Sequence, residues 1–338
     1  MPTKKIVGTS RISPHIAQEG RSGRLRKRYA PTIGEHAIKW TDRLTEAVKS
    51  GEELKVTAGK VRRGLYRPYN SQFLYFDHLL NQRRYQQHRI FPTEACEAEN
   101  VSIIIKNSGE WSFFVLAANS LSDLLPQGGS QCFPFYTYDE DGTNRRENIT
   151  DWALAEFRSH YGQKSVAKLD IFHYAYALLH HPDYRTRYAA NLKRDLPRIS
   201  RAADFAKFAM YGEALMDRHI NYEKQREYPL ERTEVGQLNW RVEKMTLSKD
   251  KTQLRYNGFL TLSGIPPEVY EYRLGNRSAL EWVIDQYQVS KDKRSGIVND
   301  PNRPDDLEYI VRLIGQVVTV SLETVRLVQE LGSLQLLP

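Results

Sequence analysis

The sequence has only two cysteines, Cys96 and Cys132, among its 338 residues. Two cysteines cannot form a disulfide framework or a cysteine-rich zinc site, and such low usage is typical of a reducing compartment. No apolar run approaches the roughly 20 residues that a membrane-spanning helix requires. The basic start Met1-Pro2-Thr3-Lys4-Lys5 is not followed by an apolar stretch, so we expect no secretory signal, no membrane partner and a cytoplasmic location.

The chain also lacks the common signatures of catalysis. It has no G-x-x-x-x-G-K-[ST] phosphate loop, no G-x-S-x-G nucleophile elbow and no H-E-x-x-H zinc motif. Asn299-Asp300-Pro301-Asn302 differs from the Asn-Pro-Pro-aromatic motif of amino-methyltransferases, because an aspartate intervenes and no aromatic residue follows. His173 and His180 lie about 10.5 Å apart along a helix, which favours capping or surface roles over a shared metal. We expect no catalytic residue, metal or cofactor in this chain.

Positive charge is concentrated near the N-terminus. The chain has 49 Lys and Arg against 41 Asp and Glu, but residues 1–90 alone have 19 basic and 7 acidic residues. This basic end fits a polyanionic partner, and a solvated basic tail accounts for it equally well. Residues 1–34 are predicted to be a basic flexible segment or linker, because they hold too little apolar surface to order themselves.

The remaining sequence predicts an α+β fold made of mixed helices and short antiparallel hairpins. Helices are predicted by apolar spacing and capping signals at 37–49, 151–161, 171–180 (capped by Asp170), 182–194, 205–219 and 279–287, with a long helix at the C-terminus. Strands are predicted at 71–76, 101–106, 111–117, 131–138, 240–247, 253–256 and 259–262, with Asn257-Gly258 as a two-residue hairpin turn. We expect one large domain over 35–338, which can divide into lobes at 35–200 and 201–338.

A first group of candidate DNA-binding residues interleaves arginine and tyrosine: Arg67, Tyr69, Arg83, Arg84, Tyr85 and Arg89. Arginine forks suit phosphates and guanine edges, and tyrosine can stack on a base or donate to a phosphate. The alternative for the tyrosines and phenylalanines of this region is that they pack a core, and we expect different members to do each.

Two further groups carry polar residues in a pattern that could meet DNA. Arg187, Asn191 and Arg194 would share one face of the predicted helix 182–194, opposite Tyr184, Tyr188 and Leu192 on its core side; a solvated face is the other interpretation. The loop 291–303 carries Lys291, Lys293, Arg294, Asn299 and Arg303, and loops of this size are often functional.

Many blocks of the chain, in one order, resemble a known family. Tyr66-Arg67-Pro68-Tyr69, followed by Leu74-Tyr75-Phe76-Asp77, resembles a stretch found just after the methyltransferase core of large single-chain restriction-modification enzymes. The likeness extends over about residues 36–328 through Gln131-Cys132-Phe133-Pro134, Asn148-Ile149-Thr150-Asp151-Trp152, Asp170-Ile171-Phe172, Leu178-Leu179-His180, Tyr184-Arg185, Asn191-Leu192, Leu196-Pro197-Arg198-Ile199, Asn221-Tyr222-Glu223, Ser278-Ala279-Leu280-Glu281-Trp282 and Ser295-Gly296-Ile297-Val298-Asn299-Asp300-Pro301-Asn302. The chain is similar to the C-terminal specificity domain of type ISP restriction-modification enzymes.

This resemblance implies a target-recognition domain that reads double-stranded DNA for adenine methylation and restriction. In the family, separate modules carry the nuclease, the helicase-like translocase, the coupler and the adenine methyltransferase. S-adenosylmethionine, ATP and Mg²⁺ are therefore expected only in those modules. The length suggests either a fragment of a split or decayed gene or a reader that works with a methyltransferase/helicase module encoded upstream or in trans.

Two other hypotheses stay open. The chain could be a protein-interaction module that docks on a methyltransferase without binding DNA by itself. It could also be an enzyme of unrecognised type, although no acid–base pair or nucleophile arrangement supports this. Because recognition residues of the family vary with the target sequence, the resemblance assigns no individual base contact.

Overall fold

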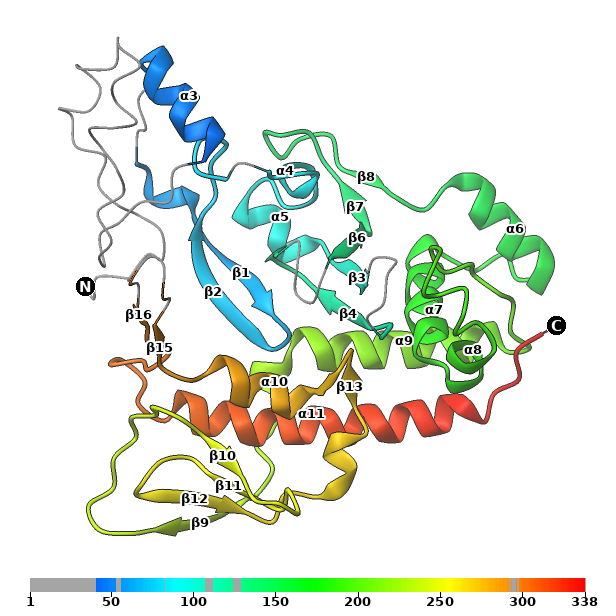
Figure 1. Cartoon of the computed structure of the whole chain (residues 1–338). Helices are drawn as coiled ribbons and strands as arrows, with labels where there is room; N and C mark the ends of the chain where they lie inside the picture. The colour runs from blue at the N-terminus through cyan, green and yellow to red at the C-terminus, as the bar shows by residue number, and fades with distance from the viewer. Residues whose placement is uncertain are drawn as a thin grey trace.

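The computed structural model describes residues 41–52, 56–81, 83–106, 112–123, 129–291, 293, 296 and 298–337. The chain has the predicted mixed α+β fold, with helices and several small sheets (Figure 1). The long helix α11 (Tyr309–Gly332) crosses the molecule beside α9 (Phe205–Ile220), with a small sheet on one side and the N-terminal half on the other. Within the described ranges, no helix is both long and apolar enough to cross a membrane. The predicted basic segment 1–34 lies outside these ranges.

The N-terminal half consists of short helices, two three-stranded sheets and the two-stranded β7–β8 sheet. Its elements are α3 (Asp42–Ser50), η1 (Ala58–Lys60), β1 (Val61–Arg67), β2 (Asn70–Tyr75), α4 (Gln87–Ile90), α5 (Glu94–Glu99), β3 (Ser102–Lys106), β4 (Val115–Ala118), β5 (Leu121–Ser122), β6 (Ser130–Pro134), β7 (Tyr136–Thr137) and β8 (Arg146–Glu147). The strand orders are β2-β1-β5, in which β1 and β5 are parallel, and β4-β3-β6. Pro134 ends the edge strand β6, as its missing N–H predicts.

Helices dominate the middle of the chain, and two of the predicted helices need correction. The elements are α6 (Asp151–Tyr161), α7 (Lys168–His180), α8 (Pro182–Arg187) and α9. Asp170 is not the cap of α7 but its third residue, and its carboxylate accepts a bond from the backbone N–H of Ala167 at 2.8 Å. The predicted helix 182–194 ends at Arg187, and turns follow it.

The C-terminal part adds a four-stranded sheet, two hairpins and α11. Its elements are η2 (Tyr222–Lys224), β9 (Glu231–Glu234), β10 (Thr246–Leu247), β11 (Gln253–Arg255), β12 (Leu260–Ser263), η3 (Pro267–Tyr270), β13 (Arg273–Leu274), β14 (Arg277–Ser278), α10 (Ala279–Gln286), β15 (Ser290–Lys291) and β16 (Val298–Asn299). Of the strand predicted at 240–247, only the last two residues pair. The Asn257-Gly258 connection is longer than two residues, because the Asn257 side chain accepts bonds from the N–H groups of Phe259 and Leu260 at 2.8 and 2.9 Å.

Two hydrophobic clusters form the interior, and α11 contributes to both. The first cluster joins α10, the β10–β12 strands and the N-terminal part of α11, including Ile314 and Val317. The second joins β3, β4, α6 to α9 and the end of α11, including Leu327 and Leu331. The predicted lobes 35–200 and 201–338 stay a prediction.

A buried hydrogen-bond network lies between the two clusters, around His219 of α9. The Tyr176 hydroxyl donates to Nδ1 of His219 at 2.6 Å, and Nε2 donates to Oγ1 of Thr324 at 3.0 Å. The Tyr272 ring stacks on the imidazole with 5.2 Å between ring centroids, and its hydroxyl meets that of Tyr69 at 2.9 Å. The neutral imidazole satisfies both of its nitrogens in this arrangement. Burial, helped by the Arg185 charge, lowers the pKa of His219 to about 3.

We predict that the chain loses stability as the pH falls below 6.5. An unfolded histidine, with a pKa of about 6.5, takes up a proton that buried His219 refuses until the pH approaches 3. Each pH unit across this window therefore costs about 1.4 kcal/mol, or about 2 kcal/mol between pH 7.5 and 5.0. Urea unfolding at both pH values measures the loss. His219→Gln should be less stable at pH 7.5 but less pH-dependent, and an unchanged pH dependence would contradict this role.

Gly212 of α9 lets α7 approach closely, which leads to a second prediction. A Cβ atom at position 212 would lie 1.8 Å from the backbone oxygen of His173. Gly212→Ala therefore has to push two packed helices apart and should cost about 3 kcal/mol in thermal or urea unfolding. Gly258→Ala is the matched control, because a Cβ there meets nothing within 4 Å. Equal stability of the two variants would show that the helices separate at little cost.

Candidate nucleic-acid interface

The β1–β2 hairpin holds two of the predicted DNA contacts, and neither is free to bind a phosphate. Arg67 forms an ion pair with Asp123 at 2.6 Å, and its guanidinium lies 4.1 Å from the centre of the Tyr66 ring. Tyr69 is 1% exposed, with a positive φ of 57° that turns the hairpin, and its ring packs against Tyr222. Tyr69 was therefore wrongly placed among the candidate contacts, because its ring and hydroxyl belong to the core.

The tyrosines and phenylalanines near this hairpin divide between core and surface. Tyr75 is buried like Tyr69, whereas the side chains of Tyr66 and Phe73 are 39% and 38% exposed. The core part of the expectation is confirmed for Tyr69 and Tyr75, and a DNA-binding role for the exposed members stays a prediction.

The loop after β2 presents Arg83, Arg84 and Tyr85 to solvent. Arg83 is exposed, Arg84 is partly exposed and Tyr85 is 57% exposed, with a φ of 44°. The two guanidinium groups have no ion-pair partner within the described ranges. These adjacent side chains offer two uncompensated charges and one exposed ring.

Arg89 follows on α4 but faces acidic neighbours. It lines a surface hollow of about 370 Å³ together with Gln86, His88, Asp139 and Glu140. His88 lies 3.2 Å from a carboxylate oxygen of Glu140. Hydrogen bonds from Asn144 and Arg146, with a smaller contribution from the charge of Arg89, lower the pKa of Asp139. Because these carboxylates repel phosphate, Arg89 is a weaker candidate than Arg83 and Arg84.

The second predicted group lies on α8 and the turns after it. Arg187, Asn191 and Arg194 are all exposed, whereas Tyr184 and Leu192 are 1% and 6% exposed in the core. The predicted division between core and surface is confirmed. The three polar side chains do not share a helix face, because the helix ends at Arg187.

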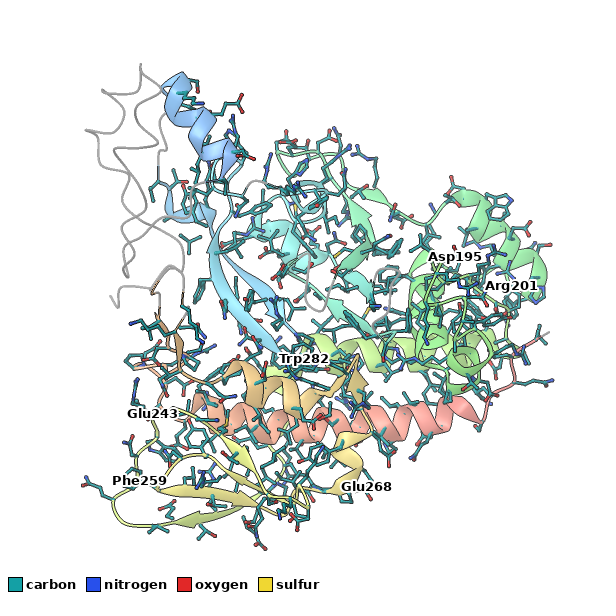
Figure 2. All side chains as sticks on the ribbon, in the orientation of Figure 1. Asp195, Arg201, Glu243, Phe259, Glu268 and Trp282 are labelled. Carbon is teal, nitrogen blue, oxygen red and sulfur yellow. The ribbon has the colours of Figure 1, made fainter. Side chains whose placement is uncertain are left out.

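This segment lies at the edge of the molecule formed by α6, α7 and α8, where Figure 2 labels Asp195 and Arg201. Burial lowers the pKa of Lys106 at the end of β3, and the nearby charge of Lys193 in this segment lowers it further.

The third predicted group lies on the β15–β16 hairpin. Lys293 is exposed and Asn299 is partly exposed, and Arg294 lies outside the described residues. Lys293 forms no ion pair with a described carboxylate, so its charge is available.

Sequence reasoning missed a cluster around Glu223 that joins the hairpin to the loop 299–303. Arg63 of β1 forms an ion pair with Glu223, and the Tyr309 hydroxyl donates to the same carboxylate at 2.7 Å. The Arg303 guanidinium lies 3.2 Å from the centre of the Tyr309 ring. Burial alone would raise the pKa of Glu223, but the Arg63 bond and charge hold it below its usual value. The cluster carries one excess positive charge, and nothing local in the sequence connects residues 160 positions apart.

The histidines at the end of α7 do not form a metal site in the described part of the chain. His180 and His181 each bond a backbone carbonyl, of Tyr176 at 2.9 Å and Leu334 at 3.0 Å, and within the described ranges no group of histidine, cysteine and acidic residues could hold a metal.

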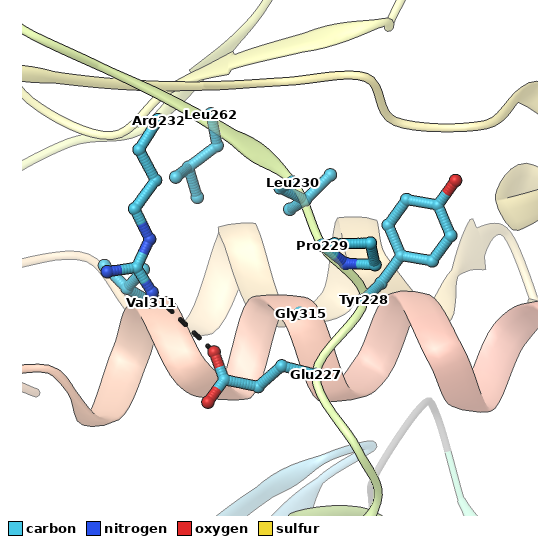
Figure 3. A pocket seen from close by; sticks show the side chains of 8 residues that line it. All are labelled: Glu227, Tyr228, Pro229, Leu230, Arg232, Leu262, Val311 and Gly315. Carbon is cyan, nitrogen blue, oxygen red and sulfur yellow. Dashed lines mark ion pairs between the residues drawn. The ribbon is translucent and has the colours of Figure 1, made fainter.

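A hollow of about 200 Å³ lies between α11 and the chain leading into β9 (Figure 3). Its Arg232 lies within ion-pair distance of Glu227 and Glu308, so its charge is compensated.

Comparison with known structures relates 90–96% of the chain to three proteins whose structures contain DNA or a DNA substrate mimic. A cryo-EM structure of a DrdV–DNA complex has a TM-score of 0.83 and 35% identity over 94% of this chain and 32% of that chain. The ATP-dependent Type ISP restriction-modification enzyme LlaBIII, bound to DNA, has a TM-score of 0.84 and 29% identity over 96% of this chain and 21% of that chain.

A third structure agrees. A nuclease-deletion mutant of the Type ISP enzyme LlaGI, in complex with a DNA substrate mimic, has a TM-score of 0.77 and 33% identity over 90% of this chain and 23% of that chain. This chain thus spans about a fifth to a third of the length of these three proteins. Comparison with curated proteins gives no match.

The family assignment follows from a match that covers most of the chain. The sequence model of the Type ISP C-terminal specificity domain matches residues 10–314, and the α+β fold described above is shared with the structures just named. The protein therefore belongs to the Type ISP C-terminal specificity domain family.

Proposed function

We propose that this chain recognises double-stranded DNA as the specificity domain of a restriction-modification system. The observation that carries the proposal is the similarity, over 90–96% of the chain, to three proteins whose structures contain DNA or a DNA mimic. In the proposal, methyl transfer, translocation and cleavage belong to a methyltransferase/helicase module, together with S-adenosylmethionine, ATP and Mg²⁺. The family description supports this division, because it names specificity rather than catalysis.

The distribution of uncompensated charge supports DNA as the partner. Many exposed arginines are ion-paired, such as Arg145 with Glu99, Arg146 with Asp139 and Arg277 with Asp285. Five candidate cations that have no ion pair within the described ranges, and that do not line the acidic hollow beside Arg89, are Arg83, Arg84, Arg187, Arg194 and Lys293. An unpaired arginine can bind phosphate without first giving up a carboxylate, so these residues are the best phosphate contacts of the surface.

The competing hypothesis is a domain that docks on a methyltransferase without binding DNA. A DNA-binding measurement on this chain alone distinguishes the two hypotheses. Phosphate contacts release counterions, so each one adds about 0.9 to the slope of log affinity against log salt. If the five unpaired cations all contact phosphate, affinity should fall about 500-fold between 50 and 200 mM salt. Fluorescence anisotropy with a labelled duplex measures this. Absence of binding, or a flat salt dependence, would favour the docking hypothesis.

We predict that Arg83→Gln with Arg84→Gln weakens binding to every duplex by the same factor and lowers the salt slope by about 2. The matched control is Arg145→Gln with Arg146→Gln, which removes two adjacent arginines whose charges are already paired. The control should change the slope much less. Equal effects from both double variants would mean that net charge, and not contact, determines affinity.

A further inference from the structure

Arg185 of α8 is partly buried and has no carboxylate partner among the described residues. Its Nε donates to the backbone oxygen of Leu179 at 2.7 Å, and its guanidinium lies 5.7 Å from the centre of the Phe113 ring. Neither terminal nitrogen bonds any part of the chain that the structure describes, and neither is sealed off from solvent. The guanidinium therefore has a free fork of two donors that an external group can reach.

The described titratable groups whose pKa is coupled to the Arg185 charge are neutral. Tyr176 and His180 come from α7, His219 from α9 and Tyr272 from the chain before β13. Burial raises the pKa of both tyrosines, so they stay protonated. Burial and then the Arg185 charge lower the pKa of His180 and His219, so they stay uncharged as well. The charge of Arg185 is consequently not compensated by any of the groups around it.

Arg62 shows how this fold handles a buried arginine that has only a structural role. Its side chain is 3% exposed, forms an ion pair with Glu97, and donates to the backbone oxygens of Phe91 and Pro92 at 3.2 Å each. An ion pair of this kind offsets the cost of removing the charge from water. Arg185 is only partly buried, and it lacks such an anion among the described residues.

The missing anion is best supplied by DNA. The same segment carries the exposed cations Arg187, Lys193 and Arg194, which make the potential around Arg185 positive and attract a polyanion. A phosphate accepts two parallel bonds from the fork and also neutralises the charge. A guanine edge accepts the same two bonds but is neutral, so it would leave the charge uncompensated.

We propose that Arg185 is a phosphate-binding residue, whose terminal nitrogens hold one backbone phosphate of the bound duplex. The inference rests on the proposed function and adds a position that the sequence did not indicate. In the free domain, Arg185 is a charge without a counterion, and DNA binding supplies the counterion.

The test compares Arg185→Gln and Arg185→Lys with the wild-type chain on duplexes that carry a single neutral methylphosphonate at successive positions. Arg185→Gln should bind about 10- to 100-fold more weakly and lower the salt slope by about 0.9. Arg185→Lys keeps the charge but loses the fork, so it should keep most of the slope and part of the affinity. One methylphosphonate position should weaken the wild-type chain strongly and Arg185→Gln hardly at all, which identifies the bound phosphate.

Two further measurements separate binding from structure. Arg326→Gln removes an arginine that is paired with Glu323 and Glu330 on α11, and it should leave affinity and slope unchanged. Arg185→Met should unfold at the same or a higher urea concentration than wild type, because it removes an uncompensated charge, whereas loss of a structural arginine would lower that concentration.

Each negative outcome has its own meaning. Wild-type affinity and salt slope in folded Arg185→Gln and Arg185→Lys would overturn the role of Arg185 while leaving DNA recognition intact. Failure of the wild-type chain to bind any duplex would overturn the proposed function and this inference together.

Discussion

The packing of α9 between α7 and α11 is the constraint on which the rest of the structure depends. Gly212 brings α9 against the backbone of α7, and about two turns further along α9, His219 bonds both Tyr176 of α7 and Thr324 of α11. The stack of Tyr272 on His219, and its bond to Tyr69, then ties the β1–β2 hairpin to the same point. The position of every candidate surface is therefore set by a few close contacts around one helix.

This arrangement explains why the exposed cations belong to separate elements. The exposed cations lie on the loop after β2, on α8 with the turns after it, and on the β15–β16 hairpin, and Tyr184 and Leu192 anchor the second of these segments in the core. No single helix or strand carries the proposed interface. A DNA duplex carries phosphates at regular intervals along its length, so a protein with cations on several separate loops can bind phosphates at separate points. The hydrogen-bond network around His219 fixes the position of the β1–β2 hairpin relative to α7, α9 and α11.

Much of the fold was predictable from the sequence because its signals are local. The apolar spacing from Phe205 to His219, the capping box at Ser278 and the glycine stop at Gly162 each act within one or two turns, and the structure confirms them. The predictions were wrong where residues far apart in the sequence determine the burial of a side chain or the end of a helix. Tyr69 is buried because Tyr222 and Tyr272 receive it, and the helix after Pro182 ends early because Leu192 turns into the second cluster. The partners of Arg63 and the isolation of Arg185 depend in the same way on contacts across the chain, which residue patterns do not report.

The course of α11 has a consequence for anyone who exchanges target specificity between enzymes of this family. The family match ends at residue 314, in the first third of a helix that continues to Gly332. A graft cut at that boundary would keep only Tyr309–Ile314 of the helix, and would remove Val317 and Val318 from the first cluster and Leu327 and Leu331 from the second. The transplanted module would then expose apolar side chains of both clusters that α11 now covers. A domain that is exchanged between enzymes therefore needs to include all of α11.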